Sequence, residues 1–268
     1  MNNVNLTAPI LKRAEEFYKA MRKFSELSME ALYSYDRSLG YVTQRNLQQE
    51  CIKSFGIGYL PMDIDSFIRL LDITVKEDLL KLGVIFIHDS KLCSIMNDRI
   101  IFPICNVSGN IVSFSGRKMP DADPEDAKYV NTRNSQIFRK SLSLFGFSQA
   151  LESIIDKGYC IVVEGNIDVM SLWQSGIKNV VAPCGTALTL QQLHILKRVC
   201  NNIVLWFDDD EAGGKALIKS YPMAVDIGFK VGCMPEQPWK DPDETLKNKS
   251  VNEILVDIDK SFYYTILN

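Results

Sequence analysis

The sequence is poor in the residues that build compact zinc sites. It contains two histidines, and none of its seven cysteines forms a Cys-x-x-Cys pair. A structural zinc site needs about four such ligands at short, regular spacing, so we predict no zinc site in this chain. Scattered cysteines of this kind are typical of reduced thiols, and we therefore expect a cytoplasmic protein.

Long apolar runs and a strong net charge are also lacking. No segment approaches the roughly 18 apolar residues that a membrane-spanning helix needs, and no secretory signal pattern opens the chain, so no membrane association is expected. The formal net charge is −3 over 268 residues. This balance neither indicates nor excludes nucleic acid, because acids at one site can mask a basic groove elsewhere. The 46% hydrophobic content is sufficient for one large domain or two small ones.

The first part of the chain is predicted to be helical. Apolar residues recur at helical spacing from about residue 7 to residue 24. Further amphipathic segments cover Met29–Leu39 and Thr43–Phe55, and Gly56 is the expected stop of the latter. These segments are typical of core-facing helices and show no chemistry of their own.

A short helix and a hairpin follow. Thr74 and Glu77 have the spacing of a capping box, which predicts that a short helix begins there. Strand patterns over 100–105 and 111–114 flank a Gly-containing turn at 107–110, which predicts a β-hairpin.

Basic residues gather after this hairpin. Between Lys128 and Lys140 there are four cations and no carboxylate, with polar residues between them and an aromatic residue near each end. Such a pattern suits contacts with phosphates and nucleotides. A solvated surface loop has the same composition, so the stretch alone leaves both interpretations open.

From residue 161 onward, strands alternate with helices. Short apolar strands over 161–163, 180–182 and 203–207 each lead through a turn into a helix, and the second turn contains Gly185 and Thr186. This alternation predicts an α/β fold with a mostly parallel sheet covered by helices on both faces. Ligands of such sheets bind beyond the carboxyl ends of the strands.

Acidic side chains follow several of these strands. The strand at 203–207 runs directly into four consecutive carboxylates, of which Asp208 and Asp210 are expected to leave the chain on one side and Asp209 on the other. Glu164 follows the strand at 161–163, so it can converge with the Asp208/Asp210 pair at one sheet edge.

A further acidic turn holds Asp241 and Asp243 on either side of a proline. Like charges about 4 Å apart repel by roughly 4 kcal/mol at an effective dielectric of 20. A bound divalent cation with oxygen ligands offsets such repulsion, and Mg²⁺ is the usual ion beside phosphates. Helix capping accounts for one or two of these acids, but acidic side chains at three places along one edge of the sheet favour a metal site.

Taken together, these motifs resemble those of a known family. Three of them resemble the TOPRIM domain shared by primases and topoisomerases: Glu164-Gly165-x-x-Asp168, Asp208-x-Asp210-x-Ala212-Gly213 and Asp241-Pro242-Asp243. The upstream motifs are similar to the RNA polymerase core of DnaG-type DNA primases of bacteria and phages: Phe55-Gly56-Ile57-Gly58-Tyr59-x-Pro61, Arg99–Ile104, Ser115-Gly116-Arg117, Lys128–Asn131 and Phe138-Arg139-Lys140.

The resemblance implies a domain order and an activity. It implies a mixed α/β N-terminal subdomain with a basic groove over 1–150, a Rossmann-like TOPRIM catalytic domain with a mostly parallel sheet over 151–248, and a helical tail over 249–268. The implied activity is a DNA primase catalytic core, a DNA-directed RNA polymerase that makes short RNA primers on single-stranded DNA during replication by metal-dependent nucleotidyl transfer.

The resemblance also implies roles for individual residues. Glu164, Asp208 and Asp210 would be catalytic and would hold Mg²⁺, with Mn²⁺ expected to substitute; Asp241 and Asp243 would be further metal ligands, and Asp168 would support them. The template and the nucleoside triphosphates would be received by a basic set formed by Arg99, Arg117, Lys128, Asn131 and Lys140. A replicative helicase would be a partner through regions absent from this sequence.

Two alternatives remain open at this point. One is a TOPRIM nuclease, which would cut a phosphodiester at the same metals, and the other is a non-catalytic nucleic-acid-binding module derived from a primase. The sequence departs from the family pattern at Asp209 and Glu211, which add negative charge where a small or basic residue is more usual. The zinc ribbon and helicase-binding region of such primases are not found in it, which fits either a fragment or a compact primase.

Overall fold

The structure is a computed structural model that describes residues 7–185 and 187–264. The contacts between residues divide the chain into two compact units. The first holds residues up to 46, 55–106 and 110–139, and the second holds 47–54, 107–109 and the residues from 140 onward. Thr186 and the last four residues of the expected tail lie outside the described residues.

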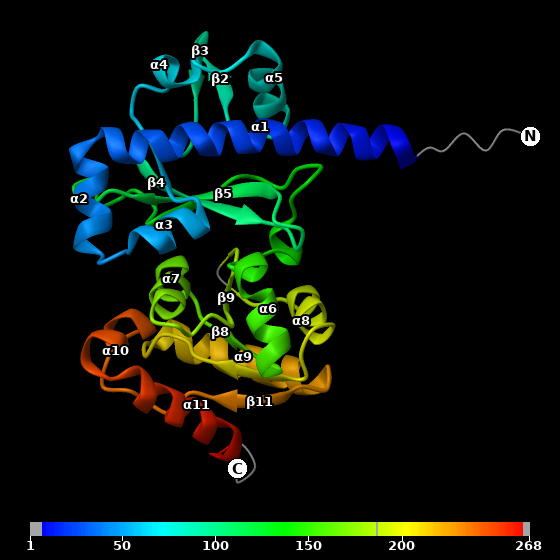
Figure 1. The fold of residues 1–268 in the computed structure, drawn as a ribbon, viewed down its shortest axis with the longest axis vertical. Helices are drawn as coiled ribbons and strands as arrows, with labels where there is room; N and C mark the ends of the chain where they lie inside the picture. The colour runs from blue at the N-terminus through cyan, green and yellow to red at the C-terminus, as the bar shows by residue number, and fades with distance from the viewer. Residues whose placement is uncertain (1–6, 186, 265–268) are drawn as a thin grey trace, which may run out of the picture. The chain divides into compact units, whose positions relative to one another are not determined.

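The first unit is built around one long helix lying across an antiparallel sheet. Helix α1, Thr7–Ser34, covers one face of the sheet (Figure 1). The strand order is β1-β4-β5-β6, with bounds Gly58–Leu60, Arg99–Cys105, Ile111–Lys118 and Tyr129–Asn131. Phe24 of the helix packs on Phe114 of β5 with ring centroids 5.1 Å apart. A β-carbon at Gly58 would lie 2.7 Å from the backbone carbon of Ser28, so only glycine lets β1 approach the helix this closely.

The other elements of the first unit are short. They are α2 (Asp36–Gln44), α4 (Ile64–Ile68), α5 (Ile73–Lys81) and the two-stranded β2–β3 ribbon (Phe86–His88 and Lys91–Cys93). The predicted hairpin is confirmed, since β4 pairs with β5 on either side of the 107–110 turn.

Three predicted helix boundaries are wrong. Helix α1 continues through Met29 to Ser34, and the chain breaks instead at Tyr35, whose backbone is extended with ψ 117°. The residues from Thr43 to Phe55 do not form one helix, because α2 ends at Gln44 and α3 begins at Gln49. The capping box is also wrong, because Thr74 lies inside α5, whose N-cap is Asp72. Apolar residues recur on both sides of the first two breaks, so periodicity did not reveal them. The third error concerns only the position at which the helix begins.

The second unit confirms the expected α/β fold. Its sheet has the order β11-β10-β8-β9-β7, in which the first four strands are parallel and β7 is antiparallel to β9. The strand bounds are Lys230–Cys233, Asn202–Leu205, Tyr159–Val162, Val180–Pro183 and Leu144–Phe145. The helices of this unit are α6 (Phe147–Lys157), α7 (Asn166–Gln174), α8 (Leu190–Lys197), α9 (Glu211–Asp226), α10 (Pro242–Asn248) and α11 (Val251–Tyr264), together with all but the last residue of α3 (Gln49–Phe55). A 3₁₀ turn covers Lys140–Leu142.

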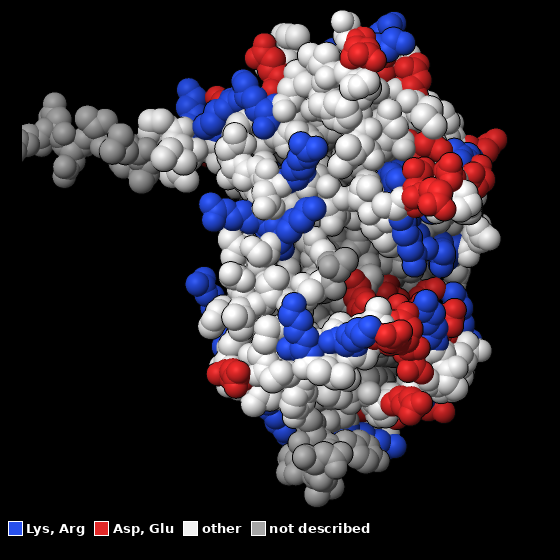
Figure 2. All heavy atoms as spheres, turned by 180° about the vertical axis from the view of Figure 1, so that it is seen from behind, with Lys and Arg blue, Asp and Glu red and all other residues white. Residues whose placement is uncertain are grey.

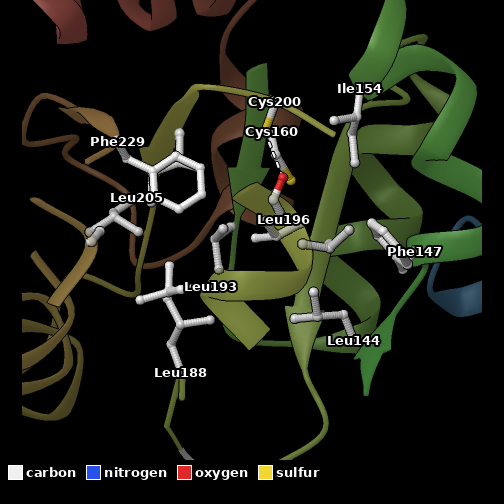
Figure 3. Close-up of a cluster of buried hydrophobic side chains, with 14 of the residues drawn as sticks. Leu144, Phe147, Ile154, Cys160, Leu188, Leu193, Leu196, Cys200, Leu205 and Phe229 are labelled. Atoms are coloured by element: carbon white, nitrogen blue, oxygen red, sulfur yellow. Dashed lines mark hydrogen bonds between the residues drawn. The ribbon is translucent and has the colours of Figure 1, made fainter. Parts of the chain in front are cut away.

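Apolar side chains from alternate strand positions form the core on one face of this sheet. Cys160, Val162, Ile203 and Leu205 meet residues of α6, α8 and α9 there, and most of the cluster is below 7% exposed (Figure 3). On the opposite face, α11 packs so closely on β11 that a β-carbon at Gly232 would lie 2.4 Å from Ser261 Oγ. The sheet is thus buried on both sides, which leaves the ends of its strands for chemistry.

The seven cysteines all fall within the described residues, and none of them forms a disulfide bond there. Among the described helices, none combines the length and the apolar character required to cross a bilayer. On the face shown in Figure 2, acidic and basic side chains adjoin one another along one edge of the second unit.

Candidate metal and phosphate site

Three neighbouring strands of the second unit bring acidic side chains to one sheet edge. β8 leads to Glu164 and then α7, β10 leads to Asp208 and then α9, and β11 leads to Asp241 and then α10. Because β11, β10 and β8 are parallel neighbours, their carboxyl ends share an edge. This is where the sequence places its carboxylates.

Glu164 and Asp208 are in direct contact. The backbone N–H of Asp208 donates to Glu164 Oε1 at 3.1 Å. Burial, followed by the negative charges of Glu164, Asp241 and Asp210, raises the pKa of Asp208 to about 6. Burial also raises the pKa of Glu164, against the lowering effect of the hydrogen bond from Asp208. Both carboxylates therefore lie where a nearby cation would stabilise their charged form.

One oxygen of this pair has no protein partner among the described residues. Asp208 Oδ1 is buried and accepts no hydrogen bond from them. A buried carboxylate oxygen without a partner is costly, since leaving a buried acceptor unsatisfied costs roughly 1–3 kcal/mol, and more for a charged group. A bound cation would satisfy it.

Asp210 is held differently, at the start of α9. Its Oδ1 accepts hydrogen bonds from the backbone N–H groups of Ala212 and Gly213, both at 3.0 Å, and the bond from Gly213 is the main cause of its lowered pKa. Its Oδ2 faces Lys240 Nζ at 3.5 Å. Asp210 therefore caps α9 with one carboxylate oxygen and directs the other toward a lysine.

Gly213 allows the acidic loop and α9 to approach each other. A β-carbon there would lie 2.0 Å from Asp208 O and 2.9 Å from Glu164 Oε1. Any larger residue would therefore push the helix away from both carboxylates. Gly213 and Gly214 both lie in the first turn of α9.

The remaining carboxylates are bound within the protein. Asp241 caps α10 by accepting from Glu244 N at 2.8 Å. Asp243 Oδ1 accepts from Ser171 Oγ at 2.6 Å, and its Oδ2 pairs with Lys247 Nζ at 2.7 Å. Asp243 therefore ties α10 to α7, and its carboxylate is already engaged on both oxygens.

Asp168 lies on α7 and is 8% exposed. Burial, with the charges of Asp241 and Asp208, raises its pKa to about 8, although it accepts a hydrogen bond from the backbone N–H of Asp243. At neutral pH this side chain is mostly the uncharged acid. It is suited to supporting the site rather than to coordinating an ion.

The carboxylates of this edge are the type of ligand that a divalent cation prefers, but they do not form a compact group of three. Within the described part of the chain, no group of three or more His, Cys, Asp or Glu side chains is close enough to hold an ion. The unsatisfied Asp208 oxygen and the coupled Glu164 carboxylate nevertheless provide hard oxygen donors of the kind that Mg²⁺ takes.

A cavity of about 250 Å³ adjoins the carboxylates. Its walls come from the end of β10, the start of α9 and the loop after β11, and include Phe207, Asp208, Asp210, Leu217, Trp239 and Lys240. Sequence reasoning did not select Lys240 as a site residue, although its position immediately before Asp241 was an available signal.

The two predicted nucleotide-binding arginines lie in the first unit and are largely buried. Strand alternation places Arg99 on the same face as Lys118 and places Arg117 on the other face with Tyr129. Arg99 donates to Ala127 O at 2.8 Å, and burial lowers the pKa of its guanidinium. Arg117 donates to the Tyr129 hydroxyl at 2.9 Å. The structure thus does not bring these two arginines onto one surface.

The other predicted polar contacts are more accessible. Lys128 is exposed at the start of edge strand β6, and Asn131 is half-buried at its end. Lys140 belongs to the second unit, where it opens the 3₁₀ turn and its carbonyl accepts from Gln192 at 3.1 Å.

Two parts of the chain match described domain families. Residues 27–151 match "DNA primase catalytic core, N-terminal domain", and residues 161–246 match "Toprim-like". The chain therefore combines the N-terminal domain of the DnaG primase core with a Toprim domain, as the motif resemblance predicted.

Individual relatives agree with this assignment. A DNA primase of Borreliella burgdorferi is 32% identical over 223 residues, covering 81% of this chain and 42% of the relative. The Aquifex aeolicus primase structure, with its zinc-binding and RNA polymerase domains, has a TM-score of 0.87 at 29% identity and covers 92% of this chain and 61% of that one.

The RNA polymerase domain of Mycobacterium tuberculosis primase DnaG is also similar. Its structure in complex with a double-stranded DNA oligomer with a 6-nucleotide overhang has a TM-score of 0.81 at 25% identity, covering 93% of this chain and 82% of that one. This chain spans less than half the length of the curated DNA primase of Borreliella burgdorferi.

Proposed function

We propose that this chain is the catalytic core of a DNA primase, which joins ribonucleotides on a single-stranded DNA template by metal-dependent nucleotidyl transfer. The observation that supports it most is the Glu164–Asp208 contact at the shared edge of β8 and β10, together with the partnerless oxygen of Asp208. The similarity of residues 27–151 and 161–246 to the primase core and Toprim families supports this choice of reaction class.

Glu164, Asp208 and Asp210 are the carboxylates that would hold divalent ions, which supply charge neutralisation at the phosphate under attack. In this proposal the ion is Mg²⁺, with Mn²⁺ as a substitute. Asp241 lies close enough to raise the pKa of Asp208 and would complete the set. Asp168 and Asp243, joined between α7 and α10, would position the loop that carries Asp241.

The protein's own part in the reaction is orientation. Asp210 is fixed by two backbone N–H groups, and Glu164 is fixed by the backbone of Asp208, so both acids would retain their places as charge enters the site. The basic set of the first unit and Lys140 would position the polyanions. Lys128 is an exposed cation of this set.

Primer synthesis tests this proposal directly. Purified protein is incubated with single-stranded DNA, Mg²⁺ and radiolabelled nucleoside triphosphates, and RNA products are resolved on a gel. Asp208→Asn and Glu164→Gln should each reduce synthesis by about 100-fold or more, since loss of even a partner of a metal ligand costs roughly 10- to 100-fold.

Glu211→Gln is the matched control. It makes the same carboxylate-to-amide change three residues from Asp208, but at an exposed side chain paired with Lys215 at 2.5 Å. It should retain most of the activity. Full activity in both site variants would contradict the proposal, and shortened template without incorporation of nucleotide would indicate a nuclease instead.

A further inference from the structure

Lys240 carries a positive charge beside the carboxylates of the acidic edge, and its backbone is held at two points. Its carbonyl accepts from Asp209 N at 2.7 Å, which joins it to the acidic loop after β10. Its N–H donates to Glu244 Oε2 at 3.3 Å, at the start of α10. The main chain of Lys240 is therefore fixed relative to Asp208–Asp210.

The side chain is held much less firmly. Lys240 Nζ lies 3.5 Å from Asp210 Oδ2 and is about half exposed. Strong charge-assisted N–H···O bonds are about 2.7–2.9 Å long, so this contact is loose and readily exchanged. Within α9, by comparison, Lys215 Nζ lies only 2.5 Å from Glu211 Oε1.

Lys240 also lines the cavity that adjoins the carboxylates. Its charge opposes the raised pKa values of Glu164 and Asp208, whose main cause is burial. Lys240 is the basic side chain that forms an ion pair with Asp210 among the described residues. A divalent ion held by the same carboxylates would repel it and release it into the cavity.

We propose that Lys240 is an exchangeable counter-charge, which balances Asp210 before ions bind and then pairs with a non-reacting phosphate of the substrate. This inference rests on the proposed function, because it assigns a substrate contact at that site. The phosphate comes either from the incoming triphosphate or from the nucleic-acid strand, and both carry the same chemistry.

The proposal predicts two effects of opposite sign. Removing the ammonium eliminates a competitor of the ion, so the protein without nucleotide should bind metal more tightly. The same change removes a phosphate contact, so substrate should bind more weakly. A lysine with a purely structural role would weaken both or neither.

The test uses Lys240→Met and Lys240→Arg in the full chain, with Lys215→Met as the control. Lys215→Met deletes the same charge at another exposed position near the acidic edge, on α9. Mn²⁺ binding to the protein without nucleotide is measured by titration. Binding of a non-hydrolysable triphosphate and of a labelled single-stranded DNA is then measured at saturating Mn²⁺.

For Lys240→Met we expect about 3- to 10-fold tighter Mn²⁺ binding and about 10-fold weaker binding of one of the two phosphate ligands. Lys240→Arg keeps the positive charge and should bind that phosphate ligand as the parent does. Loss confined to the triphosphate assigns the contact to the nucleotide, and loss confined to DNA assigns it to the strand. Unchanged binding of both, or changes equal to those of Lys215→Met, would overturn the proposal. None of these readouts requires primer synthesis, so a chain that binds as expected but incorporates no nucleotide would refute the proposed function alone.

Discussion

Aspartates of the same chemical type behave in different ways at this sheet edge because their surroundings differ. Asp210 is exposed and accepts two backbone N–H bonds, and its pKa is lowered, chiefly by the bond from Gly213. Asp168 is buried near other carboxylates, and its pKa is raised to about 8. Burial and neighbouring charge therefore separate the acids into one that stays ionised and one that stays protonated at neutral pH.

The state of Asp168 gives a prediction for stability against pH. An unfolded aspartate has a pKa of about 3.9, so between roughly pH 4 and 8 the folded protein holds one more proton than the unfolded chain. The free energy of unfolding should therefore fall as pH rises through this range, with a slope of up to about 1.4 kcal/mol per pH unit from this group. Asp168→Asn should flatten the slope and make the metal-free protein more stable than the parent at pH 8.

Urea unfolding in EDTA at pH 5.5, 7 and 8 measures this slope. Asp156→Asn, an exposed change on α6, is the control and should leave the slope as it is in the parent. Parallel curves for the parent and Asp168→Asn would show that Asp168 does not carry the additional proton.

At the scale of elements, the site depends on how a strand passes into a helix. β10 ends at Leu205 and α9 begins at Glu211, and within this short connection the chain must place Asp208 beside Glu164 and Asp210 at the helix start. The close approach of Gly213 to Asp208 O makes this geometry possible. The two glycines in sequence have different roles, since nothing lies within 4 Å of a β-carbon built at Gly214.

The two glycines provide a matched pair of substitutions. Gly213→Ala should destabilise the protein by about 1–3 kcal/mol, as expected for overpacking, and should reduce the stabilisation by Mg²⁺ because α9 shifts away from the carboxylates. Gly214→Ala should instead stabilise the helix by up to about 1 kcal/mol. Thermal unfolding with and without millimolar Mg²⁺ measures both effects, and a Gly213→Ala variant as stable and as metal-responsive as the parent would contradict this account.

The elements also show what the sequence could predict and why. The parallel strands were predicted because continuous apolar runs followed by acids are distinctive, and the meeting of Glu164 with Asp208 followed from the rule for strand ends. The break at Tyr35 could not be predicted, because no glycine or proline marks it. The opposite facing of Arg99 and Arg117 depends on the β4–β5 register, which motif spacing does not contain.

At the scale of the whole molecule, the charge balance limits how the protein can bind a polyanion. The net charge is −3, and several of the cations pair with acids, as Lys215, Lys247 and Lys249 do. Long-range attraction by the total charge therefore gives no affinity for nucleic acid, and the binding that the proposed function requires would depend on a few locally placed cations. An exposed cation of the basic stretch, such as Lys128, is then expected to contribute a full phosphate contact.

Salt dependence distinguishes such a contact from general electrostatic attraction. For single-stranded DNA, each phosphate neutralised contributes about 0.7 to the slope of log binding constant against log salt concentration. Lys128→Ala should therefore lower the magnitude of the slope by roughly 0.7 and weaken binding similarly for unrelated sequences. Lys19→Ala removes an exposed lysine from α1 outside the predicted basic set and should leave the slope unchanged. Fluorescence anisotropy between 50 and 200 mM salt measures the slopes. Equal slopes for the two variants would mean that Lys128 contacts no phosphate, since the release of counterions would then be the same whichever lysine was removed.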